Sequence, residues 1–277
     1  MRRLERDRTK IHENFTGDKR RENLVDLYQA AANDLLIDKV TKRRVFSSGR
    51  WKKIKNQLGV ETHGKCGFCE TPTDASYWGD VEHFRPKSVH WWLAYCYDNF
   101  LYSCAPCNGA KSNNFEPLGV SLPAPDLTAD MTENELWEVA QNFAPDPSDL
   151  AAVNEYHQAC IAEESALPNP YHENVEELIA WQVIPEVEEV VAISIEQNPR
   201  SEVAVDAVIR LVDLNRAELR TQRYGVYERI ERLRRLLNSV DPAAVEIGEE
   251  LLEMASAPDS PYSAMVRYFL VQWELVA

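Results

Sequence analysis

The spacing of apolar residues predicts helices across the first 60 residues. In the stretch 21–40, five apolar positions fall roughly on one face of a helix: Leu24, Leu27, Ala31, Leu35 and Val40. The stretch 49–60 repeats this spacing with Trp51, Ile54 and Leu58. Stripes of this kind are typical of side chains that pack into a core rather than of a cofactor site, so we expect a helical N-terminal segment.

Helical patterns return in the second half of the chain. Residues 200–239 form one long helical stretch with a predicted break near Asn215. Residues 180–195 are rich in β-branched side chains and predict a short pair of strands. Capping signals predict three further helix starts: Thr132 followed by Glu135, Asp241 before Pro242, and Ser260 before Pro261.

Between these helical regions, residues 66–118 have a different composition. Cysteine, glycine, proline and aromatic residues follow one another in short segments, which indicates turns and short strands. We therefore predict a mainly α fold with a small irregular module embedded in it. The expected boundaries are a basic helical arm at 1–60, the module at 61–120 and an acidic, mostly helical region for partner binding at 121–277.

Charge divides the chain unevenly. Residues 1–55 contain 16 lysines and arginines against 8 acidic residues, a net charge of +8, whereas residues 56–277 contain 14 basic and 37 acidic residues, a net charge of −23. The basic segment is either a solvated helix face or a contact for an anionic partner, and the pattern leaves both open. Because lysine and arginine supply most nonspecific affinity for nucleic acid, such a function would need this arm or a partner protein.

The hydropathy of the chain predicts no membrane contact. No run approaches the roughly 18 consecutive apolar residues that a spanning helix needs. The first residues, MRRLERDRTK, lack the apolar core of a signal peptide. We therefore expect a cytosolic protein.

Four of the six cysteines form two closely spaced pairs: Cys66 with Cys69, and Cys104 with Cys107. Two such pairs suit a tetrahedral zinc ion with each thiolate about 2.3 Å from the metal. Disulfides or redox chemistry are the alternative, and the reducing cytosol favours metal over them. Four sulfur ligands leave zinc no open position, so we predict a structural ion. Cys96 and Cys160 have no such partner, and we expect them to be buried thiols.

The cysteine pairs enclose a segment rich in polar residues. If residues 80–84, DVEHF, form a strand, Asp80 and Glu82 lie on one face while Val81 and His83 lie on the other. Glu82 and His83 can then share a site only at a bulge or at a strand end.

A short helix is expected directly after this segment. If it begins near Cys107, Asn108 and Lys111 share a face because they are three residues apart. Its N-terminal amides would then point toward the same cleft, which favours a phosphate there.

Three strings, CGFCE, GDVEHFRPKS and YDNFLYSCAPCNGAKSNNF, together resemble the HNH endonuclease family in its form with four zinc-binding cysteines. Members of that family carry a ββα-metal active site. By this resemblance His83 corresponds to the general-base histidine, Glu82 to an acidic metal ligand and Asn99 to the asparagine that ties down the loop. Asn108 occupies the last motif position, a metal ligand that is histidine in many members.

The resemblance also implies how such a site would cleave a phosphodiester. A neutral histidine can take a proton from the attacking water, and a divalent ion can stabilise the charge on the leaving oxygen. The oxygen ligands of Glu82 and Asn108 favour Mg²⁺ or Mn²⁺. For His83 alone, a structural histidine is the alternative. Three cationic residues are candidates for phosphate contacts, with a solvated charge as the alternative for each: Arg85, Lys87 and Lys111.

Weaker matches extend beyond the module. The strings LPNP near Asn169, LNRAELRTQR at 214–223 and PYSAMVRYFL near the C-terminus resemble the longer family of retron-associated HNH endonucleases, which includes PtuB of the Septu anti-phage system. That family implies an ABC/SMC-like ATPase partner, PtuA, which would hold the nuclease in check. The acidic charge of residues 56–277 also favours action through a partner.

These observations support three functional hypotheses. The leading one is a metal-dependent nuclease subunit of an anti-phage complex, with DNA favoured as substrate. The second is a ribonuclease directed at tRNA, because nothing in the sequence distinguishes the sugar. The third is a non-catalytic zinc module for protein interaction, in which Glu82 and His83 no longer perform chemistry.

Overall fold

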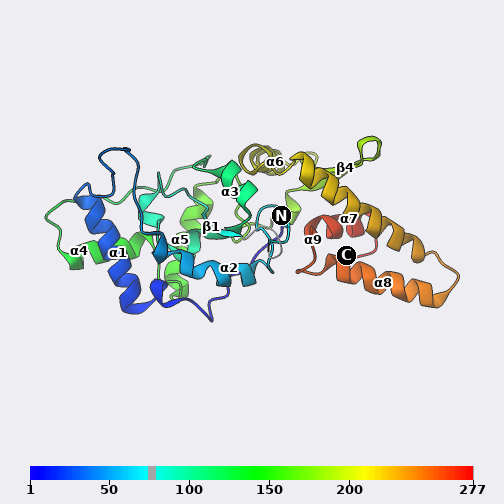
Figure 1. The fold of residues 1–277 in the computed structure, drawn as a ribbon, viewed down its shortest axis with the longest axis horizontal. Helices are drawn as coiled ribbons and strands as arrows, with labels where there is room; N and C mark the ends of the chain where they lie inside the picture. The colour runs from blue at the N-terminus through cyan, green and yellow to red at the C-terminus, as the bar shows by residue number, and fades with distance from the viewer. Residues whose placement is uncertain (74–78, 277) are drawn as a thin grey trace.

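A computed structural model describes residues 1–73 and 79–276 (Figure 1). Within these residues the helices are α1 (Gly17–Ala32), α2 (Lys55–Glu61), α3 (Ala105–Lys111), α4 (Glu133–Phe143), α5 (Leu150–Ala162), α6 (Pro199–Val212), α7 (Ala217–Leu236), α8 (Pro242–Ser256) and α9 (Ser263–Gln272). Two antiparallel pairs of strands complete the fold: β1 (Asp80–His83) with β2 (Phe100–Ser103), and β3 (Ala180–Ile184) with β4 (Glu189–Ile193). The prediction of a mainly helical chain is confirmed.

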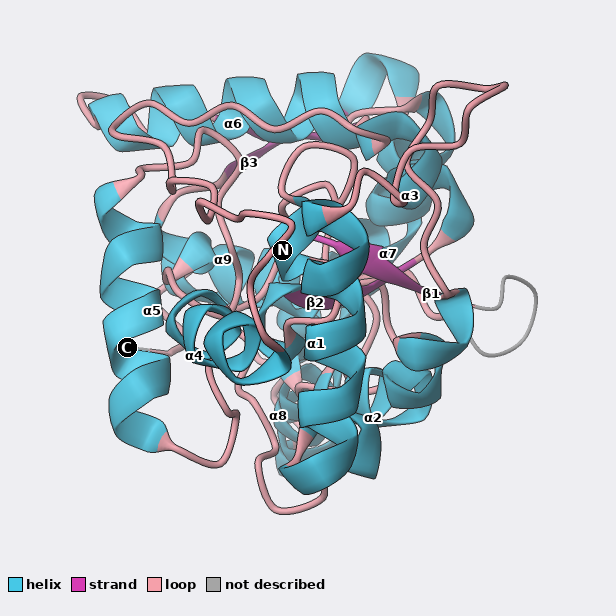
Figure 2. Cartoon of the chain, turned by 90° about the vertical axis from the view of Figure 1, so that its left-hand side faces the viewer, coloured by secondary structure: helices cyan, strands magenta, loops and turns pink. Residues whose placement is uncertain are grey.

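The molecule is elongated, and the cysteine-rich module lies in its middle (Figure 1). Helices α1 and α4 lie at one end, and α7, α8 and α9 lie at the other. Figure 2, seen from the first of these ends, shows α1 and α4 side by side. No helix of the described residues is long and apolar enough to cross a bilayer.

The first predicted helix forms but is shorter than its hydrophobic pattern. Helix α1 ends at Ala32, so Leu35 and Val40 lie outside it and are 71% and 89% exposed. The chain reverses because Asp34 adopts a left-handed backbone conformation (φ 57°). The second stripe is confirmed as core, since Trp51, Ile54 and Leu58 are all buried.

Most predictions for the second half are confirmed. Thr132 and Glu135 form a capping box at the start of α4. Residues 180–193 form the expected pair of strands, β3 and β4. The long helical stretch breaks after Val212, where Asp213 is left-handed (φ 52°), and Asp241 caps α8 through the backbone amide of Ala243.

One predicted helix start is wrong. Helix α9 begins at Ser263, not after Ser260, because Tyr262 is left-handed (φ 55°) and takes the N-cap position. The buried Tyr262 side chain explains the shift. Its hydroxyl donates to Gln222 Oε1 at 2.6 Å and lies 3.2 Å from the hydroxyl of Thr71, so it ties this turn to α7 and to the cysteine-rich module.

The module itself consists of two antiparallel strands followed directly by α3. Glu82 pairs with Leu101 and His83 pairs with Phe100 across the ladder. The predicted strand forms but ends at His83, one residue before the expected end, and the helix expected near Cys107 begins at Ala105. Of the two ways in which Glu82 and His83 could share a site, a bulge or a strand end, the structure has the strand end. A β-carbon at Gly79 would lie 2.2 Å from the ring of Tyr102, so this close approach requires glycine.

The β1–β2 pair separates two hydrophobic cores. Phe100 and Tyr102 pack into the core formed with α1, α2, α4 and α5. Leu101 points to the opposite face and joins the core that contains the four clustered cysteines and residues of β3, β4, α6, α7 and α9. This alternation follows the two-residue period of a strand. The module therefore lies between the two cores and contributes side chains to both.

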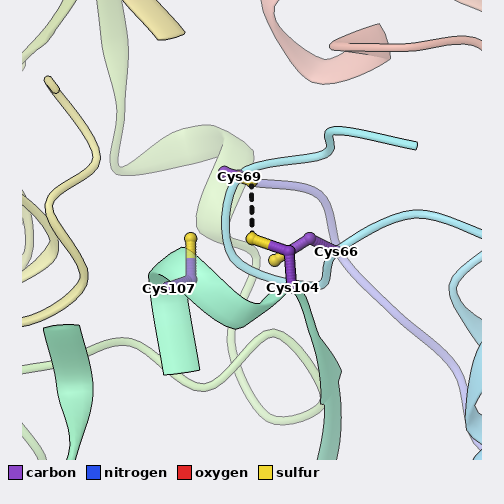
Figure 3. A group of neighbouring side chains, drawn as sticks. All are labelled: Cys66, Cys69, Cys104 and Cys107. Atoms are coloured by element: carbon purple, nitrogen blue, oxygen red, sulfur yellow. Dashed lines mark hydrogen bonds between the residues drawn. The ribbon is translucent and has the colours of Figure 1, made fainter. Parts of the chain in front are cut away.

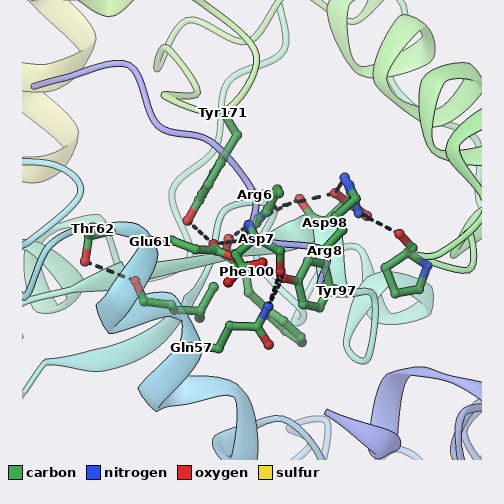
Figure 4. Close-up of polar contacts among 12 residues, drawn as sticks. Arg6, Asp7, Arg8, Gln57, Glu61, Thr62, Tyr97, Asp98, Phe100 and Tyr171 are labelled. Carbon is green, nitrogen blue, oxygen red and sulfur yellow. Dashed lines mark hydrogen bonds and ion pairs between the residues drawn. The ribbon is translucent and has the colours of Figure 1, made fainter. Parts of the chain in front are cut away.

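Part of the basic charge near the N-terminus is used inside the protein (Figure 4). The Arg6 guanidinium donates to Glu61 Oε2 at 3.0 Å and to the carbonyl oxygen of Phe100. Arg8 pairs with Asp98 at 2.5 Å. These arginines therefore attach the N-terminal segment to α2 and to the start of β2. Neither hypothesis for the basic arm anticipated this structural role.

Candidate metal centre and active site

The four paired cysteines converge in one buried cluster (Figure 3). Their sulfur atoms all lie within 4.8 Å of one another, and Cys69 Sγ lies 3.8 Å from Cys104 Sγ. A tetrahedron with metal–sulfur distances of about 2.3 Å has edges of about 3.8 Å. A disulfide needs sulfurs about 2.05 Å apart. The cluster can therefore hold a zinc ion, and all six cysteines are free thiols in this structure.

The first cysteine pair lies in a tight loop on β2. The amide of Gly67 donates to the carbonyl of Tyr102 at 2.8 Å, and the amide of Glu70 donates to the carbonyl of Cys66 at 2.9 Å. A β-carbon at Gly67 would lie 2.7 Å from a methyl carbon of Leu101. Glycine inside this cysteine pair thus permits the close docking that brings both sulfurs to the cluster.

The second pair spans the end of β2 and the start of α3. Cys104 is the N-cap residue of the helix, and its carbonyl accepts the amide of Asn108 at 2.9 Å. Cys107 lies in the first turn. The remaining cysteines, Cys96 and Cys160, are buried in the other core as predicted. Burial raises the pKa of Cys96 to about 12 and that of Cys160 to about 11, so both stay protonated thiols at neutral pH.

His83 is held in one orientation by its neighbours. Its Nε2 lies 3.0 Å from the carbonyl oxygen of Ala94. Because a carbonyl can only accept, Nε2 carries the proton and Nδ1 keeps the lone pair. The rings of Trp51 and Phe100 pack edge to face against the imidazole at centroid distances of 5.0 and 5.1 Å. Burial lowers the pKa of His83 to about 3, with Lys87 adding to the effect, so the ring is neutral.

Glu82 forms a buried ion pair with α3. Lys111 Nζ lies 2.7 Å from Glu82 Oε1 and 3.0 Å from the carbonyl oxygen of His83. Burial raises the pKa of Glu82, and the ammonium of Lys111 opposes that rise. This pair is the direct link between the helix and the end of β1.

Asn99 holds the chain after β1 in place. Its Oδ1 accepts the amide of Arg85 at 2.8 Å, and its Nδ2 donates to the carbonyl of Arg85 at 3.0 Å. Asn99 is fully buried, and its own carbonyl accepts the amide of Phe84 at 2.8 Å. These bonds fix the backbone on the C-terminal side of His83.

The other three predicted site residues, Arg85, Lys87 and Asn108, differ in their burial and in their partners. Arg85 is 1% exposed and pairs with Glu163 at 2.5 Å, so its charge is directed into the protein. Lys87 is half-buried, its Nζ lies 5.2 Å from the Trp51 ring centroid, and burial lowers its pKa. Asn108 is half-buried on α3, one turn before Lys111. Direct contacts thus join Glu82, His83 and Lys111.

Sequence reasoning missed two partners of His83. The helical stripe identifies Trp51 only as a core residue, whereas its contact with His83 joins residues 32 positions apart. The carbonyl of Ala94 carries no sequence signal, since every residue has one. The helical spacing of Trp51 gave no sign of this contact either, because it indicates only which face of a helix is buried.

Glu82 and Asn108 carry one carboxylate and one side-chain amide, and the direct partner of Glu82 in this structure is Lys111. A carboxylate and a side-chain amide are ligands that Mg²⁺ or Mn²⁺ accept. The charge of Glu82 is balanced by Lys111 in this structure, so an ion would share the carboxylate with the ammonium or displace it.

Comparison with known proteins finds a similarity that covers part of the chain. No known family model matches the sequence. Over 86 aligned positions, the sequence is 31% identical to the Septu protein PtuB of Bacillus mycoides (strain KBAB4). The match covers 26% of this chain and 29% of PtuB, so the similarity extends over less than a third of either protein.

Proposed function

We propose that this protein is an HNH-type endonuclease subunit of an anti-phage defence complex that cleaves phosphodiester bonds, with DNA as the favoured substrate. The observation that carries the proposal is the orientation of His83. His83 is the last residue of β1, next to Glu82, and α3 lies beside this strand end. The Nε2 atom of His83 is held by the carbonyl oxygen of Ala94. The partial similarity to PtuB supports the defence role.

In this proposal, Nδ1 of His83 takes the proton of the attacking water. The ring is neutral, as a base must be, but a pKa of about 3 is far below the working pH. Burial is the main cause of that low pKa, so movement of the covering side chains on substrate binding would raise it toward the ordinary value of about 6.5. In this proposal, the buried, low-pKa state of His83 is the resting state of the nuclease.

Four further residues would support the reaction. Glu82 and Asn108 would hold a Mg²⁺ or Mn²⁺ ion, which when bound supplies positive charge for the leaving oxygen. Lys87, half-buried beside Trp51, would contact a flanking phosphate. Asn99 keeps the chain after His83 in register through its two bonds to Arg85.

The acidic charge of the chain favours action through a partner. A protein with net charge −15 is repelled by nucleic acid except where its lysines and arginines are concentrated. An ABC/SMC-like ATPase of the PtuA type would bring the substrate and release the restraint. We assign the acidic helical region at 121–277 to that contact.

A cleavage assay tests the proposal. Purified protein, alone and with a PtuA-type ATPase, is incubated with double-stranded DNA and with tRNA in the presence of Mg²⁺ or Mn²⁺. We expect His83→Ala to reduce cleavage by about 100-fold or more. The control is His63→Asn, which changes an exposed histidine and should keep full activity. The backbone of His63 is left-handed, a conformation that asparagine tolerates. Wild-type cleavage by His83→Ala would overturn the assignment, and cleavage confined to tRNA would change the substrate.

A further inference from the structure

The cysteine cluster has a cationic neighbour far away in the sequence. Arg216 Nη1 lies 3.4 Å from Cys107 Sγ, and its Nη2 lies 3.8 Å from Cys69 Sγ and 4.0 Å from Cys104 Sγ. One guanidinium therefore faces three of the four sulfur atoms. The contact joins α7 to cysteines more than 100 residues earlier in the chain.

The backbone holds Arg216 firmly at this point. Its neighbour Asn215 makes two bonds to β4: Oδ1 accepts the amide of Ala192 at 2.9 Å, and Nδ2 donates to the carbonyl of Ala192 at 2.9 Å. Arg216 is the N-cap residue of α7, and its Nη1 also donates to the carbonyl of Asp213 at 3.2 Å. The turn at Arg216 is therefore held by β4 on one side and by the start of α7 on the other, and the side chain extends from it toward the sulfur atoms.

Besides Arg216, a second arginine of α7 lies on this side of the core and needs a negative charge nearby. Arg223, about two turns further along α7, is fully buried and lies 4.6 Å from the ring centroid of Trp181. Its three guanidinium nitrogens are buried without a hydrogen-bond partner among the described residues. A buried, unpaired charge is strongly unfavourable. A zinc ion with four thiolates carries a net charge of −2, which matches the two arginines.

We propose that Arg216 is an outer-sphere component of the metal centre, which stabilises bound zinc by donating to three thiolates, and that Arg223 supplies the second compensating charge. The metal centre then belongs jointly to the cysteine-rich module and to the region that begins with α7. Loss of the metal would release the start of α7 from the module. This role rests on the cysteine cluster alone and not on nuclease activity.

The position of Arg216 also makes it a barrier to reagents. A cavity of about 420 Å³ opens beside the cluster, and its lining includes Cys104, Pro106, Thr71 and Arg216. A chelator or an electrophile that approaches through this cavity meets the guanidinium next to the sulfur atom of Cys104. Removal of the guanidinium therefore both weakens the charge balance and opens the route.

The rate of zinc release to an excess of a chromogenic chelator tests the proposal. We expect Arg216→Gln to release zinc about 10- to 100-fold faster than the wild type, the range typical of lost outer-sphere partners. Arg229→Gln, an exposed arginine on the same helix, should release zinc at the wild-type rate. A structural role alone would not move the sulfur-to-metal charge-transfer band of the cobalt-substituted protein, whereas loss of Arg216 should shift it.

A second variant keeps the test decisive if Arg216→Gln does not fold. Arg216→Lys retains the positive charge but loses the planar pair of donors, so its release rate should lie between those of the wild type and the glutamine variant. Equal release rates and equal cobalt spectra for the folded Arg216 variants and for Arg229→Gln would overturn the proposal. Because neither readout uses nucleic acid, the result is independent of the proposed nuclease function.

Discussion

Lys111 Nζ lies 2.7 Å from Glu82 Oε1, and both side chains are buried. This ion pair fastens α3 to the end of β1, where His83 is located, and so couples the helix after the cysteine cluster to the candidate site. Since the ammonium also donates to the carbonyl of His83, the orientation of the histidine backbone depends on the same lysine.

Replacement of Lys111 by alanine should lower stability strongly. The change leaves the Glu82 carboxylate buried without its partner, which typically costs about 3–5 kcal/mol. Urea unfolding of the zinc-loaded protein measures the free energy of unfolding. Lys53→Ala, at an exposed position, serves as the control and should change it by less than about 0.5 kcal/mol. A loss below about 1 kcal/mol for Lys111→Ala would show that the pair does not form in solution.

Replacement of Cys104 by serine should remove the metal and loosen the fold. Three sulfur ligands bind zinc less tightly than four, so zinc content should fall well below the about one ion per chain expected for the wild type. Elemental analysis and thermal unfolding check both effects. The matched control is Cys160→Ala, which alters a buried cysteine of the other core and should retain the metal. Full zinc content in Cys104→Ser would rule out the four-cysteine site.

Stability should decrease as the pH falls below about 6.5, in part because of His172. Its ring lies 4.4 Å from that of His157, and burial lowers its pKa to about 2. The unfolded chain binds a proton below about pH 6.5 that folded His172 does not accept, so the contribution is full above that pH and is lost below it. His83, with a pKa of about 3, acts in the same direction.

The variant His172→Gln should therefore lose less stability on acidification. Between pH 7 and pH 5 we expect a loss about 1–2 kcal/mol smaller than in the wild type, measured by urea unfolding at both pH values. His12→Asn, which changes a half-buried histidine outside this pair and keeps an acceptor for the amide of Asn14, should follow the wild-type curve. Parallel curves for His172→Gln and the wild type would mean that His172 is accessible to protons in the folded state.

Lys52 and Lys53 should contribute to nucleic-acid binding. Both are exposed, and they follow directly on Trp51, whose ring contacts His83. Their joint replacement by glutamine should weaken binding and reduce the slope of log affinity against log salt by about 2, because each lysine neutralises about one phosphate. The same charge change at Lys39 and Lys42, in the loop after α1, is the control. Equal effects of the two double variants would indicate a diffuse charge effect.

Local signals predicted the elements but not their ends. The capping box at Thr132 and the stripe at Trp51, Ile54 and Leu58 were predicted because they depend on neighbouring residues. The end of α1 and the start of α9 were not, because both depend on residues other than glycine in the left-handed conformation, Asp34 and Tyr262. Tyr262 is tied to Thr71 and Gln222, which lie far away in the sequence.

The same distinction holds at the candidate site. The cysteine spacing was sufficient to predict a cluster. Strand alternation required a bulge or a strand end for Glu82 and His83 to share a site, and the structure has the strand end. The partners of Arg85 and Lys111 could not be predicted, since Glu163 and Glu82 are brought to them by the packing of α5 and of β1. A buried charge selects its partner through the tertiary fold, and no local pattern records that choice.

The most direct test of the nuclease assignment is the sequencing of nucleic-acid ends in cells. Phage-infected cells carry the wild-type protein or His83→Ala, in each case with a PtuA-type ATPase. We predict new DNA ends after infection with the wild-type protein, and neither new ends nor phage protection with His83→Ala at equal protein and zinc levels. Protection by His83→Ala equal to that of the wild type, without new DNA or RNA ends in either strain, would contradict the assignment.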